Sequence, residues 1–257
     1  MKKKNFSIVI YILSSILVLI LSLFVYRIIT HLSYVYAPDE VLLSKYTGER
    51  ILNSQAEKPA KIATYTNTKE PISGLSTADM VLEFLNSSST ITYKAIYSSE
   101  AAENINANVS LKDYGASSIQ KFKFSDNIMR TDNKGTSATS IFVTFNEDTS
   151  SNFLYCDGEY YHYKGLHIDK DTNSPIKLSN IIVQFIHGTI KDEEYLTASE
   201  NSGTGLFFCG GVAQNINWNR AKNTAIEINY KEGGEVLLKP GPTWWIFIDI
   251  DCSVSYD

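Results

Sequence analysis

The stretch YYHYKGLHID, residues 160–169, holds the side chains best suited to chemistry, namely His162, His167 and Asp169. Imidazole and carboxylate groups bind metals and exchange protons near neutral pH. A glycine separates the two histidines, so the convergence of three ligands does not follow from the spacing, and we predict no metal site. We interpret His167 and Asp169 as hydrogen-bonding residues of a turn and as the first candidates for a ligand site.

Two neighbouring tryptophans, Trp244 and Trp245, lie in PGPTWWIFIDID and point to opposite faces if that run is a strand. One of them must belong to the core. The other either packs in the sheet as well, the interpretation we favour, or lines a groove for a sugar, peptide or protein. Trp218 and Trp244 therefore join His167 and Asp169 as candidate ligand-binding residues.

No other pattern supports catalysis. The glycine-rich run at 203–211 precedes a strand-like segment, whereas a phosphate cradle needs a helix N-terminus. Cys209 has no base marked beside it, although His187 is a formal candidate. We predict no catalytic residue, no metal and no cofactor, and we favour a protein that is not an enzyme.

An uncharged run of 21 residues, 6–26, follows Lys2, Lys3 and Lys4. At about 1.5 Å per residue in a helix, it matches a hydrocarbon core of roughly 30 Å. Secretory signals have shorter apolar regions and end in small residues, which this run lacks. The sequence predicts a single-pass anchor at residues 6–26, with residues 1–5 in the cytoplasm and residues 27–257 outside the cell.

The formal net charge is −5, and the chain beyond the three N-terminal lysines carries −8. An acidic body without a basic patch argues against nucleic acid as a partner. The predicted partners are the membrane, through the N-terminal helix, and an envelope protein. Richness in Lys, Asn, Ile, Ser and Tyr is typical of low-GC bacteria such as Firmicutes.

The pattern of elements predicts an α+β fold. Residues 27–59 form a stalk with a short helix near 40–46, residues 60–135 a small αβ portion, and residues 136–257 a β-rich C-terminal domain. The best predicted helix is 74–88, where Ser76 caps the start and Asp79 completes a capping box.

Strands are predicted wherever apolar and polar residues alternate or branched and aromatic residues cluster. Tight turns are predicted at Asp157-Gly158 and Gly233-Gly234. The predicted strands are 61–67, 90–97, a short one at 122–124, 141–145, 152–155, 159–164, 180–188, 205–211, 216–219, 224–230, 235–239 and 243–250.

Several segments resemble the YerB-like bacterial lipoproteins, a family whose domains have no known function. SGLSTADMVLEFLNSSSTITYKAIYSS, at 73–99, resembles the family's helix–strand signature. SNIIVQF, GTGLFF, INWNR and GGEVLLKPGPTW follow in the family's order. His167 and Asp169 fall on a recurring family segment, whereas His162 does not. The resemblance spans 60–99 and 140–250.

Two departures limit what this resemblance implies. The family is usually lipid-anchored through an N-terminal cysteine, but the first cysteine here is Cys156. The family's basic block is replaced by residues 100–118, which contain no arginine or histidine. We therefore expect a membrane-anchored extracytoplasmic binding or scaffolding module of the cell envelope, with a role in envelope remodelling or sporulation. The alternative is an envelope enzyme or a small-ligand or glycan-binding protein that uses His167 and Asp169.

Overall fold

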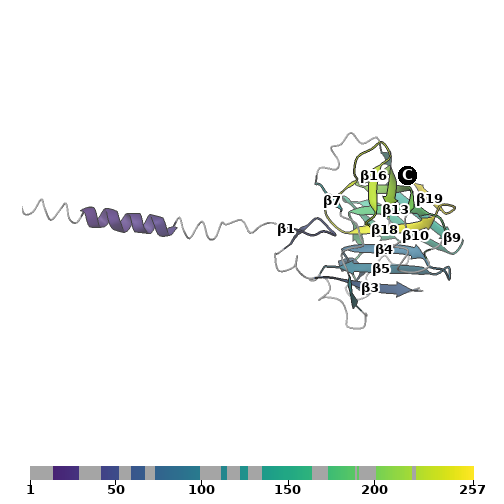
Figure 1. Ribbon diagram of the computed structural model, residues 1–257, viewed down its shortest axis with the longest axis horizontal. Coiled ribbons are helices and arrows are strands. Elements are labelled where there is room, and N and C mark those ends of the chain that lie inside the picture. The colour runs from purple at the N-terminus through teal and green to yellow at the C-terminus, as the bar shows by residue number, and fades with distance from the viewer. Residues whose placement is uncertain are drawn as a thin grey trace, which may run out of the picture. The chain divides into compact units, whose positions relative to one another are not determined.

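The computed structural model describes residues 14–28, 42–51, 59–66, 73–98, 111–114, 122–126, 135–163, 173–188, 190, 201–221 and 224–257. The chain divides into two compact units, Met1–Val41 and Leu42–Asp257 (Figure 1).

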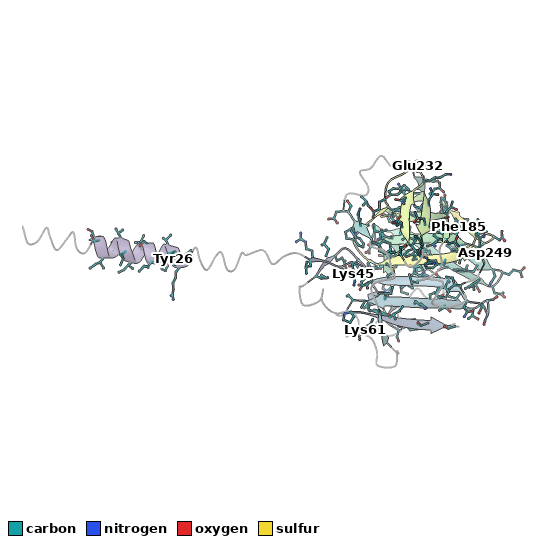
Figure 2. The ribbon with its side chains drawn as sticks, in the orientation of Figure 1. Tyr26, Lys45, Lys61, Phe185, Glu232 and Asp249 are labelled. Atoms are coloured by element: carbon teal, nitrogen blue, oxygen red, sulfur yellow. The ribbon has the colours of Figure 1, made fainter. Side chains whose placement is uncertain are left out.

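The first unit contains a helix at residues 14–28, all of whose side chains are exposed. Its large apolar side chains include Val18 at 67% and Tyr26 at 66% exposure, and Figure 2 shows Tyr26 projecting from the helix. No helix among the described residues is both long and apolar enough to cross a membrane. The first part of the predicted anchor, residues 6–13, lies outside the described residues.

The second unit is built from strands in two main sheets. A five-stranded antiparallel sheet has the order β12-β11-β10-β9-β19. Its strands are β9 (Ser140–Asn146), β10 (Thr149–Cys156), β11 (Glu159–Tyr163), β12 (Lys177–Leu178) and β19 (Ser253–Tyr256).

A ten-stranded mixed sheet has the order β16-β15-β14-β13-β18-β4-β5-β3-β6, with β8 paired to β15. Figure 1 shows β18, β4, β5 and β3 side by side. Its strands are β3 (Ala60–Thr66), β4 (Met80–Leu85), β5 (Ile91–Tyr97), β6 (Leu111–Tyr114), β8 (Thr136–Ser137), β13 (Asn180–Ile186), β14 (Asn201–Cys209), β15 (Val212–Arg220), β16 (Glu227–Tyr230) and β18 (Thr243–Asp249).

Two short pairs complete the described strands. An antiparallel hairpin joins β1 (Leu42–Leu43) to β2 (Arg50–Ile51), and β7 (Lys123–Phe124) lies parallel to β17 (Leu237–Leu238). The hairpin stands where a short helix near 40–46 was predicted, so that prediction is wrong for residues 42–46. The turn is set by Ser44, whose hydroxyl accepts from the amides of Tyr46 and Thr47.

Both faces of the large sheet are buried. One face packs on the five-stranded sheet in an apolar layer that includes Val81, Ile141 and Trp244. The other face forms a second layer that includes Leu82 and Trp245 and is covered by parts of the short pairs, among them Phe124. Strands that are buried on both faces need apolar residues at nearly every position, and β4, β13 and β18 have mostly apolar sequences.

The predicted helix at 74–88 is wrong. Only a 3₁₀ turn forms, at Leu75–Thr77, and Gly74 precedes it with φ 86° and no side-chain cap. The chain then continues as β4. Asp79 accepts a hydrogen bond from the amide of Ser98, the residue that follows β5, instead of capping a helix. MVLEFL is therefore a strand with two buried faces, a pattern that an apolar helix shares.

The β-rich part of the predicted fold class is confirmed. The α-helix of the αβ portion is wrong, since the described part of residues 60–135 contains strands and one 3₁₀ turn but no α-helix. Residue 135 also does not separate two compact bodies. β4 lies parallel to β18, with Leu82 opposite Trp245, so segments from both sides of that position share one sheet.

The two predicted turns are confirmed. Asp157 and Gly158 join β10 to β11 with φ values of 53° and 87°, both in the left-handed region that a two-residue hairpin of this type needs. Gly233 and Gly234 have φ values of 102° and 90° and form the turn that follows β16. The predicted strands at 61–67, 90–97 and 141–145 correspond to β3, β5 and β9.

Candidate functional site

The sequence-predicted ligand residues separate into two groups. His167 and Asp169 lie outside the described residues. Trp218 and Trp244 are described, with exposed fractions of 3% and 0%. Neither indole reaches the surface, so a ligand role for either stays a prediction and would require the strands around them to open.

Trp218 is held from several sides. It lies on β15, and its indole Nε1–H donates to the carbonyls of Phe185 and Thr204, each at 3.1 Å. A Cβ atom at Gly203, the residue opposite, would lie 2.8 Å from that nitrogen, so only glycine leaves room for the ring. These contacts give Trp218 a structural role.

Trp244 and Trp245 point to opposite faces of β18, as predicted, and both are buried. The interpretation that both pack in the sheet is confirmed. Trp245 stacks on Phe247 at a centroid distance of 5.2 Å. Trp244 points toward the five-stranded sheet. On that same face it contacts a polar side chain of the neighbouring strand β4, which the sequence analysis did not single out.

That side chain is Glu83, at the middle of β4 and 1% exposed. The Trp244 indole Nε1–H donates to its Oε2 at 2.6 Å. The hydroxyls of Tyr93 and Ser151 also act on the carboxyl group, and both favour its charged form. Since β5, β18 and β10 contribute one partner each, four strands meet at this carboxyl group.

Ser151 connects the group to a histidine. Its Oγ lies 2.9 Å from Nε2 of His162 on β11. The imidazole is 4% exposed and lies against Trp244 with a centroid distance of 4.8 Å. Glu83, Tyr93, Ser151, His162 and Trp244 are called the buried polar cluster below.

Burial dominates the electrostatics of the buried polar cluster. It raises the pKa of Glu83 to about 7, although interactions with Trp244, Ser151 and Tyr93 lower that pKa. Burial, together with the nearby Glu83 carboxylate, raises the pKa of the Tyr93 hydroxyl far above its ordinary value. Tyr93 therefore stays protonated, while Glu83 changes charge near neutral pH.

The cluster pairs a hydroxyl with an imidazole and an acid, groups that acyl-transfer enzymes also combine. Here, however, every member is at most 8% exposed and lies between two sheets. The arrangement can hold and move protons, but it presents no nucleophile to solvent. No group of three histidine, cysteine or acidic side chains converges as a metal site among the residues that the structure describes.

The cysteines add no reactive centre. Cys156, Cys209 and Cys252 are all free. Burial raises the pKa of the Cys209 thiol to about 11, so it is not an activated nucleophile, and its formal partner His187 is exposed. Cys156 is exposed at the end of β10, next to the turn into β11.

Sequence reasoning missed Glu83 because it was assigned to a helix. The available signal was a single carboxylate inside the apolar run MVLEFL, since an acid in such a strand must find partners. His162 was correctly placed on the same strand face as Tyr160, and both are buried. Its link to Ser151 and Glu83 could not be read from the sequence.

Comparison with known proteins confirms the resemblance. Residues 127–245 match the family model for the C-terminal domain of DUF3048, a protein of unknown function. Among solved structures, the chain is similar to the YerB protein from Bacillus subtilis, with a TM-score of 0.59 and 17% sequence identity. The likeness covers 83% of this chain and 99% of that chain and, at this identity, concerns the fold alone. No curated protein matches the chain.

Proposed function

We propose that this chain, in which residues 127–245 form a YerB-like domain of unknown function, is a membrane-anchored extracytoplasmic binding or scaffolding module of the bacterial cell envelope. The observation that carries the proposal is the N-terminal run at 6–26. It is free of charge and follows three lysines, and its described part is a helix with exposed apolar side chains. Such side chains are stable in hydrocarbon and unfavourable in water.

A binding role for the body is supported by its outer surface. Phe142 on β9 and Leu154 on β10 are 41% and 39% exposed on the five-stranded sheet, on the side away from the large sheet. Aromatic side chains such as phenylalanine are enriched in protein interfaces, and a neighbouring leucine adds apolar contact area. Since the buried polar cluster faces inward, we propose that β9 and β10 make the contact with an envelope protein.

The second candidate is an envelope enzyme or small-ligand-binding protein that uses His167 and Asp169. Both residues lie outside the described residues, so no described geometry favours that candidate. Its test is a ligand and metal screen on His167→Ala and Asp169→Asn.

Topology is the first property to test. Cys156 is exposed, Cys209 is buried and Cys252 is partly exposed, so a membrane-impermeant maleimide reports mainly on Cys156 once Cys252 is replaced by serine. In protoplasts that express the full chain, we expect labelling before lysis and its loss in Cys156→Ser. Labelling only after lysis would place the body in the cytoplasm and contradict the proposal.

Partner capture tests the contact surface. Crosslinking in membranes, followed by affinity capture of the full chain, is expected to yield a stoichiometric envelope protein that an anchor-only control does not capture. Phe142→Ser with Leu154→Ser should abolish capture. Leu43→Ser is the matched control, because Leu43 is 58% exposed but lies on the β1–β2 hairpin. Equal capture by both variants would exclude this surface.

A further inference from the structure

We propose that Glu83, Ser151 and His162 form a pH-responsive bridge between the two sheets, which holds them together while Glu83 is neutral and loosens when Glu83 ionises. This inference concerns the interior of the body and is independent of the proposed anchor and partner.

The bridge spans the apolar layer between the sheets. Glu83 belongs to β4 of the ten-stranded sheet, whereas Ser151 and His162 belong to β10 and β11 of the five-stranded sheet. Phe153 and Trp244 lie around it, with Phe153 at a centroid distance of 4.9 Å from the His162 ring. A hydrogen-bonded link in such surroundings is strong, and an unbalanced charge there is costly.

Proton counting makes the bridge sensitive to the charge of Glu83. Ser151 has one hydroxyl proton and two neighbours, the Glu83 carboxyl group and His162 Nε2. When Glu83 is neutral, it can donate to Ser151, whose own proton is then free for His162. When Glu83 is ionised, Ser151 must donate to the carboxylate and accept from His162.

The groups that face Glu83 decide how well the charge is tolerated. Trp244 on β18 and Ser151 on β10 are neutral donors. Tyr93 on β5 is a titratable donor that remains protonated. On β11, His162 is one hydroxyl away from Glu83. Ionisation of Glu83 therefore leaves a buried negative charge that is stabilised by neutral hydrogen-bond donors and has no cation in direct contact among these groups.

The direction of the pH effect follows from the raised pKa. The pKa of Glu83 is about 7 while the two sheets are together and 4.5 when the side chain is exposed to water. Its stabilising contribution is complete below about pH 4.5 and is lost as pH rises to 7. Because one proton is released on opening in this range, the opening constant should rise about tenfold per pH unit and level off above pH 7.

Hydrogen exchange of the full chain in detergent micelles measures this opening. We expect protection factors of the β10 and β11 amides, corrected for intrinsic exchange, to fall about tenfold per pH unit from pH 5 to 7. Amides of β3 and β5, within the large sheet, should change less. In Glu83→Gln the β10 and β11 protection should lose this dependence. Glu235→Gln, an exposed glutamate paired with Lys123, should behave as the wild type.

Two further variants keep the test decisive. Asp79 also has a pKa raised by burial, to about 6, and Glu49 lies near it. If Asp79→Asn removes the pH dependence and Glu83→Gln does not, the bridge is not the sensor.

If Glu83→Gln fails to fold, Ser151→Ala replaces it. Loss of the Ser151 hydroxyl should shift the midpoint of the pH profile upward, and an unchanged midpoint would overturn the proposal.

Discussion

At the scale of single residues, Trp244 and Trp245 allow the buried carboxyl group to be probed with a matched pair of substitutions. Trp244 donates to Glu83, whereas Trp245 Nε1 has no hydrogen-bond partner among the described residues. Trp244→Phe should cost about 1–3 kcal/mol because a buried acceptor loses its donor. Trp245→Phe should show only the loss of packing.

The pH dependence of this pair separates hydrogen bonding from packing. Removal of the Trp244 donor raises the pKa of Glu83 further, since that bond favours the charged form. The extra cost of Trp244→Phe should therefore grow as pH rises above 7, whereas the cost of Trp245→Phe should not. Urea unfolding of both variants at pH 5 and pH 8 measures the difference, and equal pH profiles would contradict the assigned bond.

At the scale of elements, the β10–β11 hairpin depends on a turn with positive φ at both positions. Gly158 has φ 87° and open space where a Cβ would lie, so Gly158→Ala tests backbone strain without a clash. We expect the free energy of unfolding to fall by about 1–2 kcal/mol. Hydrogen exchange should be faster in β10 and β11 than in β3, and uniform acceleration would show that the hairpin does not open separately.

At the scale of the whole molecule, Leu42–Asp257 is one compact unit. Because β18 pairs with both β4 and β13, neither side of residue 135 can complete its sheet without the other. We expect the protection of β4 and of β13 to be lost in a single transition at the same urea concentration. Two separate midpoints would restore the division into two domains.

The sequence predicted the strands that have one patterned face and a recognisable turn, such as β5, β9 and the β10–β11 hairpin. It failed at β4, since a strand between two buried layers has no alternation to distinguish it from a helix. The buried polar cluster was also out of reach. Glu83 is distant in sequence from Ser151 and His162, and its proximity to them depends on how the two sheets stack.

The position of β18 has a consequence for biogenesis. Residues 243–249 lie between β4 and β13, although residues 80–85 and 180–186 are synthesised well before them. During synthesis, the centre of the large sheet is therefore missing until residue 249 has emerged. Until then the flanks of β4 and β13 present unpaired backbone groups, a state that is prone to aggregation. We infer that the nascent chain depends on a chaperone more than its final stability would suggest.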